Sequence, residues 1–265
     1  MKCVANRAGK VFIVGAGPGA DDLITLRGLR ALHEAEVILY DALISTKLLD
    51  QAPSHAERIY VGKRCGHHSM RQEDINRLIV TKAREGRMVL RLKGGDPLIF
   101  GRGGEEALAC AEAGVDFEIV PGVSAVLGAA SFAGIPLTHR GVSSSVAFVT
   151  AHGARCGHSP DLSWVSLAEA ADTLVIFMGS AWLAKIAAAL IESGLPGTKP
   201  VAVVSNATRE TQVTVLGSLD NIAGQVSQAG LEPPMLIIVG DVTRLSELLN
   251  WYKRHQEAAC ISALP

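Results

Sequence analysis

Charge is scarce in this chain, and neither sign dominates. Lys and Arg number 25 against 26 Asp and Glu, so the formal net charge is −1, and only 19% of the residues are charged. Such a chain has no long-range field to attract DNA or an anionic membrane. The 48% of hydrophobic residues indicates a well-filled globular core and argues against disorder. A polyanionic small molecule stays possible as a ligand, because a local cluster of Arg and Lys can be offset by acids elsewhere.

Cysteine spacings typical of metal or redox sites are absent. The five cysteines are scattered, odd in number and without any C-x-x-C pair. This pattern favours reduced thiols over a disulfide scaffold or a zinc site. The neighbouring His67 and His68 would point to opposite sides of an extended chain, so they make a poor ligand pair. We therefore expect no metal site.

Only one uncharged run is long enough to raise the question of a membrane span. It covers residues 119–138, but it includes two prolines, three glycines and many small residues. A loop followed by a helix of small residues explains it better. The apolar run at residues 11–14 passes straight into a glycine turn, as a first strand would and a secretory signal would not. We expect a soluble, cytoplasmic protein with no membrane partner.

The stretch RLKGGDPLIFGRGGEE at residues 91–106 organises the rest of the sequence. It follows an alternating strand pattern and leads into a helix that opens with two acids. Gly94 and Gly95 would let the backbone approach a ligand, and Asp96 offers a carboxylate to a hydroxyl or amine. In an open α/β sheet, ligands bind beyond the carboxyl ends of the strands, where this loop falls. The alternative is a tight strand-to-helix connection without a ligand.

Hydrophobic periodicity predicts two sets of strands and helices, separated by a short polar crossing near residues 134–145. Strands are expected at residues 10–14, 36–40, 58–61, 88–92, 117–120, 146–150, 173–178, 201–205, 211–216 and 235–239. Helices are expected after Thr25 and Ser69 and at residues 46–49, 105–113, 182–192, 219–228 and 245–252. We therefore predict an α/β fold of two α/β domains, residues 10–135 and 146–252, with a ligand cleft between them.

The glycine turn at residues 15–20 matches the G-x-G-x-x-G/A fingerprint of dinucleotide-binding folds, with Asp41 at a later strand end. Alone, it would predict an NAD-dependent dehydrogenase. However, Pro18 removes an N–H donor that a pyrophosphate needs, and Asp21 and Asp22 would repel it. A ligand without phosphate fits better, and the dehydrogenase is the less favoured alternative.

Taken together, the motifs resemble the tetrapyrrole methylase family over roughly residues 10–250. The resemblance lies in GAGPG (15–19), YDAL (40–43), VGKRCGHHS (61–69), the stretch at 91–106, PGVSA (121–125), GIPLTHR (134–140), LVIFMGS (174–180) and NATRETQ (206–212). It is strongest to members that methylate uroporphyrinogen III at carbon with S-adenosyl-L-methionine. It implies the class III methyltransferase fold, with the cofactor in the cleft between two domains.

The resemblance also implies roles for individual residues. Asp41 would be the proton acceptor and Lys63 the proton donor. A carboxylate is suited to this role, because attack by a pyrrole carbon builds positive charge on the ring. Contacts to S-adenosyl-L-methionine, which leaves as S-adenosyl-L-homocysteine, are implied for Pro18, Gly94, Gly95, Asp96, Ile99, Ser124, Ala125, Met178 and Ala207.

The implied substrate carries many carboxylates, so cations should line its site, with Arg favoured for its bidentate geometry. Beside Lys63, the candidates near the predicted loops are Arg64, Arg91, Lys93, Arg102, His139 and Arg140. The alternative for each is a solvated surface charge.

We therefore expect a methyltransferase that converts uroporphyrinogen III to precorrin-2 by methylation at C2 and C7, in sirohaem or cobalamin biosynthesis. By family likeness it would be a homodimer, and it would not bind nucleic acid. Its length leaves no room for an added NAD-dependent oxidase and ferrochelatase module. The alternatives are another precorrin methyltransferase of the corrin pathway, the dehydrogenase, and a sensor that binds the methyl donor without turnover.

Overall fold

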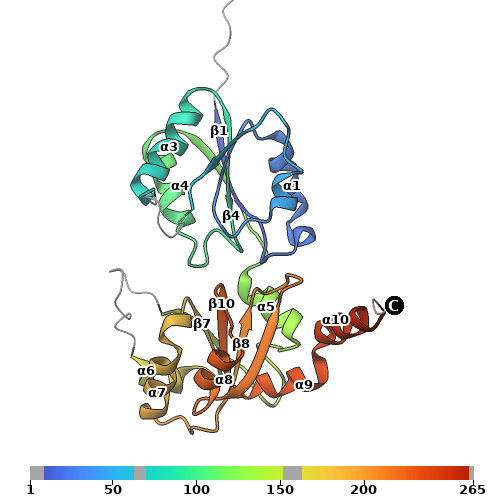
Figure 1. The fold of residues 1–265 in the computed structure, drawn as a ribbon. Coiled ribbons are helices and arrows are strands. Elements are labelled where there is room, and N and C mark those ends of the chain that lie inside the picture. Colours follow the sequence, from blue (N-terminus) through green and yellow to red (C-terminus); the bar gives the residue numbers. More distant parts are fainter. Residues whose placement is uncertain (1–8, 63–69, 152–162, 263–265) are drawn as a thin grey trace, which may run out of the picture. The chain divides into compact units, whose positions relative to one another are not determined.

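The computed structural model describes residues 9–62, 70–151 and 163–262, with side chains as far as residue 258, and it divides into two compact units (Figure 1). The first unit spans residues 1–125 and the second residues 126–265. Each holds one five-stranded sheet with helices, so the predicted α/β fold class is confirmed. No helix in the described part of the chain has both the length and the apolar character needed to cross a bilayer.

The sheet of the first unit is parallel throughout, in the order β3-β2-β4-β1-β5. Its strands are β1 (Lys10–Gly15), β2 (Val37–Tyr40), β3 (Glu57–Tyr60), β4 (Met88–Lys93) and β5 (Asp116–Val120). Because all five run the same way, their carboxyl ends lie along one edge.

Helices cover both faces of this sheet, as Figure 1 shows. α1 (Leu26–Glu34) and α2 (Thr46–Leu49) pack on one face, and α3 (Gln72–Arg84) and α4 (Gly103–Glu112) pack on the other. The neighbouring strands β1 and β4 thus lead to helices on opposite faces, and their connections run in opposite directions across the sheet. This makes the β1–β4 junction the topological switch point, where open α/β sheets bind ligands.

The second sheet is mixed, in the order β6-β7-β10-β8-β9. Its strands are β6 (Val146–Thr150), β7 (Thr173–Phe177), β8 (Pro200–Ser205), β9 (Val213–Ser218) and β10 (Met235–Val239). β10 is antiparallel to both neighbours, so β7 and β8 run parallel to each other and end at the same edge.

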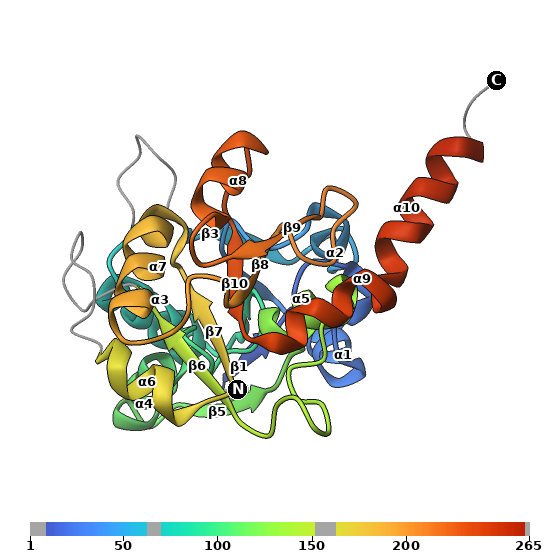
Figure 2. The same cartoon turned by 90° about the horizontal axis from the view of Figure 1, so that it is seen from below.

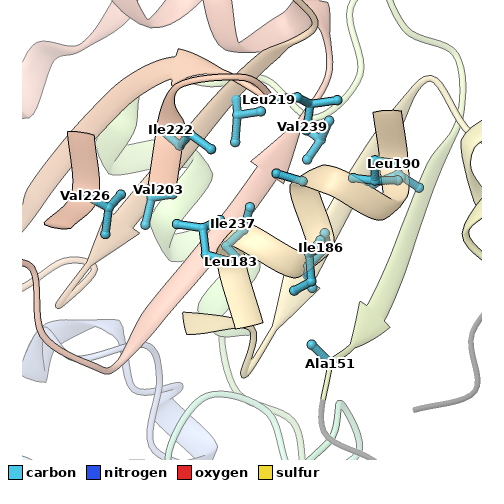
Figure 3. Close-up of a cluster of buried hydrophobic side chains, with 14 of the residues drawn as sticks. Ala151, Leu183, Ile186, Leu190, Val203, Leu219, Ile222, Val226, Ile237 and Val239 are labelled. Carbon is cyan, nitrogen blue, oxygen red and sulfur yellow. The ribbon is translucent and has the colours of Figure 1, made fainter. Parts of the chain in front are cut away.

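Two layers of helices enclose the second sheet. Figure 3 shows Leu183, Ile186 and Leu190 of α7 (Leu183–Glu192) with Val203 and Ile237 of the sheet. Each fully buried aliphatic side chain contributes about 1.5–3 kcal/mol relative to exposure. The remaining helices are α5 (Ala125–Ala133), α6 (Trp164–Ala170), α8 (Ile222–Gln228), α9 (Ser246–Leu249) and α10 (Trp251–Ser262).

The boundary between the units differs from the one that the sequence predicts. The predicted N-terminal domain includes α5, whereas the compact units divide at residues 125 and 126. The reason is that Val126 and Ala129 of α5 pack against Val175 and Ile238 of the second sheet.

The sequence predicts one helix over residues 245–252, but the structure has two helices in this region. Asn250, with φ −71° and ψ 80°, separates α9 from α10, and α10 extends away from the sheet (Figure 2).

Candidate functional site

Three glycine-containing loops meet at the switch point of the first sheet. Gly95 N–H donates to the Gly17 carbonyl at 2.7 Å, and Gly17 N–H donates to the Gly95 carbonyl at 3.3 Å. The Asp96 carboxylate holds the third loop, because its Oδ2 accepts from Gly122 N–H at 3.1 Å while its Oδ1 accepts from Leu98 N–H at 2.8 Å. The loops after β1, β4 and β5 therefore form one connected edge.

The glycines at this edge serve loop packing first. A Cβ on Gly15 would lie 2.6 Å from both the Gly122 Cα and the Gly95 carbonyl oxygen. A Cβ on Gly94 would lie 2.9 Å from the Leu43 Cβ. Gly95 also has φ +68°, in the left-handed region that favours glycine. Their missing side chains let the loops touch, so at this edge the glycines serve a tight connection whether or not a ligand is bound.

Backbone strain is concentrated in the predicted motifs. In the described chain, every non-glycine residue with positive φ lies in residues 91–106, 174–180 or 206–212. These residues are Phe100 (52°), Arg102 (60°), Met178 (54°), Asn206 (49°) and Thr208 (66°). Such conformations persist where the surroundings enforce them, and they cluster at functional sites. Sequence reasoning misses Phe100 and Thr208 because their residue types carry no signal of left-handed backbone, whereas Asn206 is of a type that adopts it more often than most.

Asp41 follows β2 and lies at the same edge. Its Oδ1 accepts a hydrogen bond from Leu43 N–H at 3.0 Å, and its Oδ2 lies 3.6 Å from Arg91 Nη2. The side chain is 24% exposed. A carboxylate oriented in this way, and still reachable, suits proton transfer.

Arg91 and Lys93, which the sequence predicts to bind substrate carboxylates, pair with a buried glutamate instead. Both side chains are buried and turn toward α4, where Arg91 Nε lies 2.9 Å from Glu106 Oε1 and Lys93 Nζ lies 3.0 Å from Glu106 Oε2. Burial lowers the pKa of Lys93; the nearby Arg91 charge acts in the same direction, and Glu106 partly offsets both effects. Cations so enclosed are not presented to substrate carboxylates. Glu106, read from the sequence only as the start of a helix, is their common partner.

Unlike Arg91 and Lys93, the other predicted cations that the structure describes are exposed. Arg102 is exposed on the loop after β4, and it binds Glu105 through two contacts of 2.7 Å. This hydrogen bonding raises the pKa of Arg102 and lowers the pKa of Glu105. His139 and Arg140 are exposed in the second unit. Lys63 and Arg64 lie outside the described residues.

The predicted cofactor residues fall into two groups. The first unit brings Pro18, Gly94, Gly95, Asp96, Ile99, Ser124 and Ala125 to the loops of its carboxyl edge. In the second unit, Met178 follows β7 and Ala207 follows β8, so both lie at one edge of that sheet. Met178 is 47% exposed, so its side chain is accessible at this edge.

These residues fit S-adenosyl-L-methionine better than a dinucleotide. In the first unit, the Asp41 and Asp96 carboxylates at this edge suit a cationic ligand better than an anionic one, and Ile99, which is 37% exposed, offers apolar surface. A pyrophosphate would need the N-terminus of a helix directly behind the glycine turn. Here a 3₁₀ turn (Asp21–Leu23) intervenes, and the Thr25 hydroxyl already caps α1 by accepting from Gly28 N–H at 3.1 Å. The arrangement therefore disfavours the dehydrogenase.

Comparison with known proteins agrees with this geometry. The family model described as Tetrapyrrole (Corrin/Porphyrin) Methylases matches residues 10–223. The chain is 48% identical over 255 residues to a siroheme synthase of Chromobacterium violaceum, covering 96% of this chain and 54% of that protein. A siroheme synthase of Thiobacillus denitrificans is 46% identical over 257 residues, covering 97% of this chain and 53% of that protein. The chain thus spans about half the length of these curated relatives.

Solved structures give the same relationship. Uroporphyrin III C-methyl transferase from Thermus thermophilus is 40% identical, with a TM-score of 0.78, covering 89% of this chain and 100% of that chain. The same enzyme has been solved in complex with S-adenyl homocysteine. A cobalt precorrin-4 methyltransferase is 30% identical, with a TM-score of 0.80, covering 92% of this chain and 99% of that chain. This chain therefore belongs to the tetrapyrrole methylases.

Proposed function

We propose that this chain is an S-adenosyl-L-methionine-dependent uroporphyrinogen-III C-methyltransferase that makes precorrin-2 by methylation at C2 and C7. The observation that carries the proposal is the match to the whole length of the Thermus thermophilus enzyme at 40% identity. The connected loops of the first unit, which leave Asp41 oriented at their edge, support it from the structure.

The residues proposed to contact the methyl donor are those that the family resemblance implies. In the first unit these are Pro18, Gly94, Gly95, Asp96, Ile99, Ser124 and Ala125, and the second unit adds Met178 and Ala207. The bound donor supplies a methyl group whose leaving group is a neutral thioether, so the protein needs no acid at sulfur. The contribution of the chain is to hold the substrate in line, a proximity effect that reaches roughly 7–11 kcal/mol in well-oriented models.

Asp41 is the proposed proton acceptor. Each transfer forms a C–C bond to a pyrrole carbon, and the resulting cationic ring must lose a proton. The Asp41 carboxylate, which is 24% exposed, hydrogen-bonded at Oδ1 and 3.6 Å from Arg91 at Oδ2, can stabilise that charge and take the proton. Lys63 remains the proposed proton donor, by resemblance alone.

The substrate carboxylates would meet cations of the loops, and Arg64, Arg102, His139 and Arg140 are the candidates. Arg91 and Lys93 suit this role less well, because both side chains are buried against Glu106. Removal of one bidentate Arg contact is expected to raise KM for the substrate with little change in kcat. Arg102→Met provides this test, with Glu105→Gln as the control that removes its partner instead.

We further propose a cytoplasmic homodimer that binds no nucleic acid and serves sirohaem or cobalamin synthesis. The net charge of −1 supports the lack of nucleic-acid binding, and the exposed Leu248 and Trp251 offer apolar surface for association. Sedimentation equilibrium would measure the oligomeric state.

The test of the activity is anaerobic incubation of the purified protein with S-adenosyl-L-methionine and uroporphyrinogen III. Mass spectrometry should show two methyl additions, and NMR should place them at C2 and C7. The second candidate is methylation of a later precorrin, favoured by the TM-score of 0.80 to the cobalt precorrin-4 methyltransferase. Methylation of that substrate but not of uroporphyrinogen III would select it. Donor binding without any product would indicate a sensor.

A further inference from the structure

Four ionisable side chains of the first unit form one chain of contacts from α4 through β4 to the end of β2. They are Glu106, Lys93, Arg91 and Asp41. We infer that Arg91, held by Glu106, is a positioning residue for the carboxylate of Asp41. The inference rests on the proposed function, in which Asp41 accepts a proton.

Every nitrogen of the Arg91 guanidinium has a partner. Nε donates to Glu106 Oε1 at 2.9 Å, and Nη1 donates to the carbonyls of Leu92 at 2.9 Å and Leu39 at 3.4 Å. Nη2 lies 3.6 Å from Asp41 Oδ2. The planar guanidinium is therefore fixed on three sides, and its last edge is directed at Asp41.

Burial distinguishes the two ends of the cluster. The side chains of Arg91 and Lys93 are each 5% exposed and that of Glu106 is 0% exposed, whereas that of Asp41 is 24% exposed. Of these four side chains, Asp41 is therefore the one that a ligand can reach. A buried ion pair is weak evidence of stability, because apolar residues of the same volume often serve as well. A cluster that ends on a reachable carboxylate has a second use, which is to orient that carboxylate.

The cluster contains two cations and two carboxylates. Lys93 Nζ lies 3.0 Å from Glu106 Oε2 and 3.2 Å from Oε1, so Glu106 contacts a second cation besides Arg91. The Nη2 edge of Arg91 faces Asp41, 3.6 Å from its Oδ2. With Oδ1 fixed by Leu43 N–H and Oδ2 facing Arg91, the Asp41 carboxylate is restrained in rotation as well as in place.

The test replaces Arg91 by an apolar side chain of similar length. Arg91→Met should lower kcat by about 10- to 100-fold, the loss that misplacement of a catalytic group by about 1 Å brings. KM for uroporphyrinogen III and the Kd for S-adenosyl-L-homocysteine, measured by calorimetry, should stay within about threefold of the wild type. Lys93→Met is the matched control, because it removes an equally buried cation from the same face of β4 but keeps the contact between Arg91 and Asp41. Its loss of kcat should be at least about tenfold smaller.

A double-mutant cycle separates positioning from simple support of the fold. If Arg91 acts through Asp41, Arg91→Met should cause no further loss of single-turnover rate in the Asp41→Ala background, whereas independent effects would multiply. Equal losses in Arg91→Met and Lys93→Met, or multiplying losses in the cycle, would overturn the inference. If Arg91→Met does not fold, Arg91→Lys replaces it in the same measurements of kcat and single-turnover rate. This variant keeps the positive charge but loses the planar set of N–H donors that contacts Glu106 and Asp41. An inactive wild type would instead refute the proposed function.

Discussion

The ionisation of the Cys110 thiol is controlled by its surroundings. It lies on α4 one turn after Glu106 and is fully buried against the first sheet. Burial, with the negative charge of Glu106 added to it, raises the pKa of the Cys110 thiol to about 11. The thiolate is the reactive form, so a cysteine in this place behaves as a small apolar residue.

We therefore predict that Cys110 resists alkylation in the native protein. At pH 8 only about one thiol in a thousand would be ionised with such a pKa, and the side chain is closed to reagent as well. Iodoacetamide treatment followed by peptide mapping should leave the Cys110 peptide unmodified, while the same treatment in guanidinium should modify it fully. Rapid labelling of the native protein would contradict the burial described for this thiol.

Single residues determine where a helix begins or a loop turns in the first unit. α1 starts after Thr25, whose hydroxyl accepts from Gly28 N–H at 3.1 Å and also lies 3.4 Å from the Pro121 carbonyl. The loop after β4 turns at Gly95, and α4 begins at Gly103. At the next residue, Gly104, there is free space for a side chain. Each feature predicts the effect of a small substitution.

Thr25→Ala should lower the free energy of unfolding by about 1 kcal/mol, because an N-cap acceptor is lost. Thr25→Ser, which keeps the hydroxyl, should stay close to the wild type. Guanidinium unfolding followed by circular dichroism measures both. An unchanged midpoint in Thr25→Ala would show that the cap adds nothing to stability.

Gly95→Ala should destabilise the protein by about 1–2 kcal/mol, because a Cβ disfavours the left-handed backbone. The added Cβ would also lie 3.3 Å from Ala125 N, so binding of S-adenosyl-L-homocysteine should weaken. Gly104→Ala is the control, since no atom lies within 4 Å of its Cβ, and it should stabilise α4 slightly. Calorimetric titration and thermal unfolding measure the pair, and equal behaviour of the two variants would count against a special role for Gly95.

At the scale of the whole molecule, both units contain carboxylates that folding keeps ionised. In the first unit, the hydrogen bond from Arg27 at 2.7 Å, with Lys10 at 3.1 Å, lowers the pKa of Glu118. In the second unit, the backbone N–H of Ser144 is the main cause of a lowered pKa of Asp172. A carboxyl with a lower pKa in the folded state stabilises above its unfolded pKa, and that stabilisation is lost as the pH falls through the folded pKa.

Stability should therefore decline as the pH falls below about 4.5, the ordinary pKa of a glutamate. Glu118→Gln should decline less steeply than the wild type between pH 5 and pH 3, with a difference below about 1 kcal/mol because the pair is partly solvated. Asp116→Asn is the control, since Asp116 is more exposed and lies 3.9 Å from Lys10. Guanidinium midpoints over this pH range give the slopes, and parallel slopes for wild type and Glu118→Gln would exclude the contribution.

The sequence by itself determines the elements and the edge at which the site lies. An apolar run at residues 11–14 and apolar alternation in residues 88–92 predict buried strands, and glycines at 15, 17, 94 and 95 mark the turns that follow them. Asp41 and Asp96 are also predictable as edge residues, because Asp41 comes directly after a strand and Asp96 lies in the glycine turn that follows one. These features are local, and short-range periodicity and turn chemistry are sufficient to predict them.

Only the tertiary structure decides where the charges of β4 point. The period of the strand puts Arg91 and Lys93 on one face, but it does not say that α4 covers that face and brings Glu106 to them. The assignment of α5 to the second unit is likewise set by packing between segments that are distant in the sequence. The physical reason is that burial and charge pairing depend on which segment covers a residue, and a single sequence does not contain that information in its local pattern.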